Sequence, residues 1–152
     1  MALVLDTTYN NVFYKNVLAK LRGLISADRD YGAIYISPTY EDKGSYSVRL
    51  WGSGAETDSI TMPTEWTKTY SVDVAMYSLE QSPDESYWEQ FLADGERLYQ
   101  IMANNTSVAG SLGWFDGVVG DMEVGATEED EEAVDGLHTI KYNFVCRISR
   151  AD

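Results

Sequence analysis

Residues 66–104 decide the fold, and they read WTKTYSVDVAMYSLEQSPDESYWEQFLADGERLYQIMAN. The first part of this stretch alternates between apolar and polar side chains. The apolar positions are Tyr70, Val72, Val74 and Met76, and the polar positions are Thr67, Thr69, Ser71 and Asp73. Because successive side chains of a strand point to opposite faces of a sheet, the alternation predicts a half-buried strand.

A helix is expected directly after this strand, because the sequence SPDE at residues 82–85 has the composition of a helix start. Ser82 is expected to be the N-cap, Pro83 to lie in the first turn, and Glu85 to complete a capping box. Apolar residues then recur at helical spacing, at Trp88, Phe91, Leu92, Leu98, Ile101 and Met102. A helix with this stripe must pack on an apolar surface, which the preceding strand supplies.

The remaining elements follow from the same patterns. A first helix is expected to begin near Thr7 or Thr8, with an apolar stripe at Val12, Phe13, Val17, Leu18, Leu21 and one of Leu24 and Ile25. Strands are expected at residues 33–37, 46–50 and 58–62, with a loop at 52–55. A bent strand at 114–124 and a long last strand at 137–148 complete the chain.

This order predicts a single α+β domain over residues 1–152, with a mostly antiparallel β-sheet packed against two helices. The predicted core joins the second helix to the sheet. Its expected members are Trp88, Phe91, Leu92, Val72, Val74 and Phe144.

Charge is the strongest signal in the composition, since the 152 residues carry a net charge of −14. Such a charge argues against binding to nucleic acid phosphates or to an anionic membrane surface. No apolar run approaches the length of a membrane span, and no secretory signal is expected at the start. A single cysteine, Cys146, excludes an intrachain disulfide and any multi-cysteine zinc site.

The acids gather in residues 125–136, for which the composition predicts a solvated, flexible loop. Its acidic side chains are Glu128, Glu129, Asp130, Glu131, Glu132 and Asp135. Such a run can bind Ca²⁺ or Mg²⁺ weakly through oxygen ligands, but the ordered spacing of a calcium loop is absent. The solvated loop is therefore the preferred interpretation, and no metal or cofactor site is predicted.

Catalytic constellations are also missing from the sequence. His138 is the only histidine, and no nucleophile motif accompanies it, so a structural role is expected. Cys146 falls in the middle of the last predicted strand and is expected to be a small buried hydrophobe. The glycines at 110–120 do not form a phosphate-binding motif. We therefore expect a protein that is not an enzyme.

The layout resembles that of the tail terminator proteins of long-tailed bacteriophages. The likeness lies in the strand sequence YSVDV at residues 70–74, the capped helix rich in aromatic and acidic residues, the short segment GWFDG at 113–117, and the long last strand. It covers nearly the whole chain but contains no diagnostic motif. The acidic segment at 127–135 is a departure from the family layout.

The resemblance implies a subunit of a ring, commonly a hexamer, on the end of the tail tube. Such a ring stops the tube from growing and contacts the head-completion or connector protein. DNA would pass through without specific binding, and an acidic lining would prevent it from sticking. Glu128 to Asp135 would then lie in the lumen or on the rim of the ring, and the protein would be part of the virion, assembled in the host cytoplasm.

Two alternatives remain open from the sequence. One is another ring of the phage neck, such as a head-completion protein. The other is a monomeric acidic module whose aromatic residues bind a peptide or a carbohydrate. The mass in solution separates these alternatives, because rings are oligomeric and a lone module is not.

Overall fold

The computed structural model describes residues 3, 5, 7–9, 11–28, 33–37, 46–61, 65–107, 113–118, 123–124 and 137–150. Three helical segments open the chain: η1 (Thr7–Tyr9), a 3₁₀ turn; η2 (Phe13–Leu18), a π-helix; and α1 (Ala19–Asp28). They are followed by β1 (Ala33–Tyr35), β2 (Tyr46–Thr61), β3 (Glu65–Leu79), α2 (Glu85–Ala103), β4 (Gly113–Val118), β5 (Glu123–Val124) and β6 (Leu137–Arg150).

The strands form one sheet in the order β1-β2-β3-β6-β4, and β5 pairs with β6 beside β4. The β1–β2 pair is parallel and the other pairs are antiparallel. The predicted α+β class is confirmed, and β1 makes the sheet mixed. The expected bent strand at 114–124 appears as the two separate strands β4 and β5.

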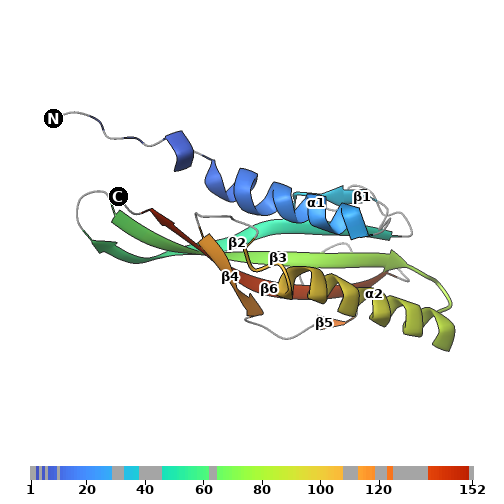
Figure 1. The fold of residues 1–152 in the computed structure, drawn as a ribbon. Helices are drawn as coiled ribbons and strands as arrows, with labels where there is room; N and C mark the ends of the chain where they lie inside the picture. The colour runs from blue at the N-terminus through green and yellow to red at the C-terminus, as the bar shows by residue number, and fades with distance from the viewer. Residues whose placement is uncertain are drawn as a thin grey trace.

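Both helices cover the same face of the sheet, with α1 on the β1–β2 side and α2 on the β6 side (Figure 1). The strand residues of this face come from alternate positions. Val48 pairs with Met76, and Met76 pairs with Ile140. The predicted core residues Val72, Val74, Phe91 and Phe144 are fully buried in this layer. Cys146 is buried there too, as expected.

Leu92 was expected in this core, and that prediction is wrong, because its side chain is 38% exposed. The buried stripe of α2 consists of Phe91, Asp94, Gly95, Leu98 and Met102. Leu92 lies about 100° around the helix from Phe91 and so points away from the sheet. Trp88 is half-buried and packs against the edge of the core.

The predicted cap of α2 also needs correction. Asp84, not Ser82, is the N-cap, and its Oδ1 accepts a hydrogen bond of 2.8 Å from the backbone N–H of Tyr87. The backbone N–H of Ser82 donates to the Glu80 carboxylate at 3.3 Å. The helix therefore starts at Glu85, two residues later than a Ser82 cap would place it.

The loop expected at residues 52–55 is wrong as well, because β2 runs through it without a break. The strand pairs with β3 along its whole length, from Tyr46 opposite Ser78 to Thr61 opposite Glu65. Its register shifts between Gly52 and Gly54 and again between Thr57 and Ser59. Bulges let a strand absorb extra residues and bend while its pairing continues.

The first helix has the predicted stripe, with Val17, Leu21 and Ile25 fully buried. Its start differs from the prediction, because Thr7 and Thr8 belong to the separate turn η1. The π-helix that follows is capped by Val12, which makes no side-chain cap hydrogen bond. Phe13 in this segment stacks on Tyr70 of β3, with 4.2 Å between ring centroids.

Candidate functional site

A close contact between α2 and the sheet is at Gly95. A Cβ atom at this position would lie 2.6 Å from Cδ1 of Ile140 on β6. The hydroxyl of Tyr142 donates a 3.0 Å hydrogen bond to the Gly95 carbonyl. Burial raises the pKa of Tyr142 to about 12, and the nearby Glu96 and Tyr99 add to the shift. This buried bond fixes α2 on β6.

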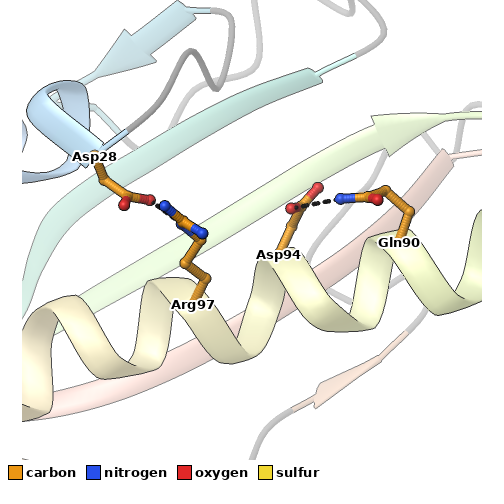
Figure 2. Close-up of polar contacts among 4 residues, drawn as sticks. All are labelled: Asp28, Gln90, Asp94 and Arg97. Carbon is orange, nitrogen blue, oxygen red and sulfur yellow. Dashed lines mark hydrogen bonds and ion pairs between the residues drawn. The ribbon is translucent and has the colours of Figure 1, made fainter.

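Polar contacts tie the two helices together on the covered face (Figure 2). Nε of Arg97 on α2 lies 2.6 Å from Oδ2 of Asp28 at the end of α1. Within α2, Nε2 of Gln90 donates to Oδ1 of Asp94 at 3.0 Å, and Asp94 is buried. The ion pair holds the end of α1 beside the middle of α2, and the Gln90 bond gives the buried Asp94 carboxylate a partner within α2.

His138 lies in an aromatic cluster where α2 meets the start of β6. Its ring centroid is 4.9 Å from that of Trp88, 5.5 Å from Tyr87 and 6.5 Å from Phe91. Its Nε2 is 3.2 Å from the Glu80 carbonyl oxygen. Burial raises the pKa of the Tyr87 hydroxyl, although the neighbouring Ser78 acts in the opposite direction. These contacts give His138 a packing role, as the sequence predicted.

The second face of the sheet, which the helices do not cover, carries paired polar groups. Asn143 Nδ2 donates to Asp73 Oδ1 at 2.6 Å, and Lys141 Nζ lies 3.7 Å from Asp73 Oδ2. The Lys141 ammonium is also 5.8 Å from the centre of the Trp51 ring. Because Asp73 is buried, these partners offset the cost of removing its charge from water. The network is a structural one, with its charges already matched.

Among the described strands, one edge of the sheet is open. Residues 52–57 of β2 are all exposed, and they pair with β3 on one side. Among the described strands, only β1 pairs with the other side of β2, and it does so only over Ser47–Arg49. A Cβ atom built on Gly54 would have nothing within 4 Å. The backbone N–H and C=O groups along this edge can therefore accept a further strand.

A shallow groove lies between α1 and β1. It has a volume of about 390 Å³ and is lined by Ala19, Arg22, Gly23, Ser26 and Ile34. Lys15 and Lys20 are exposed on the same helical segment. Of the ion pairs formed between described residues, none involves Lys15, Lys20 or Arg22. Here a strongly acidic chain presents three positive charges that form no ion pair with another described residue.

The acidic residues predicted to line a lumen or rim lie outside the described residues. They are Glu128, Glu129, Asp130, Glu131, Glu132 and Asp135. Within the described ranges, no three His, Cys, Asp or Glu side chains gather as a metal site would require. None of the helices seen in those ranges is both long and apolar enough to span a membrane.

Sequence reasoning missed both exposed features, the open edge of β2 and the cationic groove beside α1. The edge was hidden by Gly52 and Gly54, which are typical of loops. The groove had a visible signal, because residues 7–27 contain three cations and no acid in a chain with a net charge of −14.

Comparison with known proteins gives no family assignment: no family model and no curated protein matches the chain. Among solved structures, a protein known only by a sequence identifier aligns with a TM-score of 0.47 and 12% identity, over 93% of this chain and 96% of that chain. Another similar chain comes from the "Virion of native gene transfer agent (GTA) particle", with a TM-score of 0.42 and 12% identity, over 90% and 91%. At these TM-scores, neither likeness assigns a function.

Proposed function

We propose that this chain is a non-enzymatic structural protein of a phage or phage-like virion, of the tail-terminator type. Copies assemble as a ring, a hexamer in the family that the layout resembles, on the end of the tail tube. The ring then contacts the head-completion or connector protein, and DNA passes through without specific binding. The layout of the sequence supports this proposal, together with the α+β fold of two helices on one face of a long-stranded sheet.

The observation that carries self-assembly is the open edge of β2. Residues 52–57 form a strand with one unpaired side in the described structure, and they contain neither lysine nor proline, the residues that commonly protect such edges. An edge of this kind binds another chain by adding its strand to the sheet. Leu3 and Leu5, which are 84% and 70% exposed, offer further apolar surface for burial between chains.

A direct test adds the purified protein to tail tubes grown from the tube protein of the same particle. We expect negative-stain images to show a ring with a central hole at tube ends, and tube growth to stop. A chain that leaves tube ends bare and tube growth unchanged would contradict the proposal.

An edge variant and a matched control sharpen this test. Ala55→Lys with Thr57→Lys places two ammonium groups on the open edge, where they oppose strand addition. This variant is expected to fold normally and to fail to form rings, because both positions are exposed. Glu89→Lys on the exposed side of α2 changes the net charge by the same amount and should leave ring formation intact.

A further inference from the structure

The cationic groove beside α1 is the strongest feature that the proposed function leaves unused. Arg22 lines the groove, and Lys15 and Lys20 are exposed on the neighbouring turns. Lys15, Ala19, Arg22 and Ser26 are spaced three or four residues apart, so they share one stripe of the helical segment. Arg22 therefore places positive charge in the groove, Lys15 and Lys20 lie near it on the same helical segment, and Ile34 of β1 contributes to its lining.

These cations differ from most others in the described structure. Arg97 pairs with Asp28, Lys141 with Asp73, Arg49 lies 4.6 Å from the centre of the Tyr35 ring, and Lys68 lies 4.9 Å from that of Tyr70. Lys15, Lys20 and Arg22 form no such contact within the described ranges. In a chain with 25 acids and 11 cations, three cations together without a carboxylate partner among the described residues indicate a surface that is matched by another molecule.

The same sequence contains a segment of complementary charge. Residues 128–135 carry six acids and no cation. We infer that the groove beside α1 binds the acidic segment 128–135 of a second copy of this chain, so that neighbouring subunits contact each other head to tail. The inference rests on the self-assembly in the proposed function, and it names the contact between subunits.

Head-to-tail contacts of this kind have a consequence for assembly. Each copy offers one groove and one acidic segment, so every contact is heterologous and a series of copies closes into a ring when the rotation permits. The acids would then face the groove at the subunit contacts and would not converge in the lumen. Acids bound at the groove and acids gathered in the lumen predict opposite effects of salt on assembly. Salt screens attraction at the groove and weakens assembly, whereas it would relieve repulsion in an acidic lumen and strengthen assembly.

Charge reversal with rescue tests the inference. One variant carries Lys15→Glu, Lys20→Glu and Arg22→Glu, and the other carries Glu129→Lys, Glu131→Lys and Glu132→Lys. Each variant alone is expected to need a protein concentration higher by about tenfold or more for assembly. In the first variant the groove and the segment repel each other, and in the second the segment carries three lysines and three acids, so it no longer attracts the groove. An equimolar mixture should assemble at a lower concentration than either variant alone, since alternating copies make every second contact a wild-type pair and set three lysines against three glutamates in the others. Circular dichroism checks that each variant folds.

A matched control reverses three exposed acids elsewhere, with Glu85→Lys, Glu89→Lys and Glu96→Lys on α2. Because this control keeps the wild-type groove and segment, it should assemble alone, and the cation-reversed copies mixed with it should stay unassembled. The inference is overturned if the control rescues equally well, if either reversed variant assembles like the wild type, or if salt strengthens wild-type assembly. Rings that persist in both reversed variants leave the proposed function standing without this contact. If the wild type never assembles, even with tail tubes present, both the groove contact and the proposed function are contradicted.

Discussion

Gly95 is the residue on which the packing of α2 against β6 depends. Gly95→Ala adds a Cβ atom 2.6 Å from Ile140 Cδ1, in a part of the core where Ile140 is fully buried. Overpacking costs about 1–3 kcal/mol, which exceeds the gain of about 1 kcal/mol in helix propensity. Gly95→Ala should therefore lower the free energy of unfolding, as measured by urea titration.

The matched background for this test is Ile140→Val, which lacks the Cδ1 atom. In that background Gly95→Ala should be neutral or stabilising, because the main clash is gone. A Gly95→Ala substitution that stabilises the protein equally in both backgrounds would show that α2 does not approach β6 this closely.

The cap of α2 gives a second prediction for single residues. Asp84→Ala should lower the free energy of unfolding by about 1 kcal/mol, because the Tyr87 N–H loses its acceptor. Ser82→Ala should change it by no more than a few tenths of a kcal/mol. If chemical denaturation gives the larger loss for Ser82→Ala, the helix begins at the position that the sequence suggested and not at Glu85.

Tyr142 links stability to pH. Its pKa is about 12 in the folded protein and about 10 in the unfolded chain. Between these values the unfolded chain loses the proton first, so the stabilisation from Tyr142 is present below about pH 10 and is lost as the pH approaches 12. Stability should fall over this range by less in Tyr142→Phe than in the wild type.

At neutral pH, Tyr142→Phe should be less stable than the wild type by about 1 kcal/mol, because its hydrogen bond to the Gly95 carbonyl is lost. Urea titrations at neutral and at alkaline pH measure both effects. Equal losses of stability with pH in the two proteins would show that Tyr142 does not hold its proton more tightly in the folded state.

At the scale of the elements, one test concerns which side of α2 packs on the sheet. Phe91→Ala should cost about 3–5 kcal/mol, because it opens a cavity in the fully buried layer. Leu92→Ala should cost less than about 1 kcal/mol, because Leu92 is exposed. Thermal or urea unfolding of the two variants compares them directly, and similar losses would mean that the helix is rotated from the position described.

The helices and strands also show how much of the fold can be predicted from the sequence. Strict alternation in β3 and β6 and the apolar stripe of α2 predicted these elements, because burial on one face imposes a period on the sequence. The glycines of β2 predicted a loop, but pairing with β3 over the whole strand outweighs local propensity. The cap was misplaced by two residues, because Ser82, Asp84 and Glu85 all suit a helix start and only the backbone geometry selects one.

The candidate site was less predictable than the fold. The acidic segment was visible in the sequence, yet its partner depends on which cations lack carboxylates, and that is a property of the folded surface. The open edge of β2 is likewise set by the short reach of β1, which pairs with only three residues of β2. Neither feature follows from periodicity.

At the scale of the whole molecule, we expect the subunit to be stable alone and to bury further surface on assembly. Within the described residues, the sheet and its two helices share one large cluster of buried apolar side chains. The features left exposed, the edge of β2 and the groove beside α1, are those to which assembly is assigned.

The mass of the purified protein in solution tests most directly the claim that its copies assemble into a ring. Sedimentation velocity over a series of protein concentrations, with and without tail tubes, should reveal a closed species of a few 17.0-kDa chains, six in the family that the layout resembles, or co-sedimentation with the tubes. A chain that sediments as a monomer at every concentration, and that does not sediment with the tubes, would contradict the account.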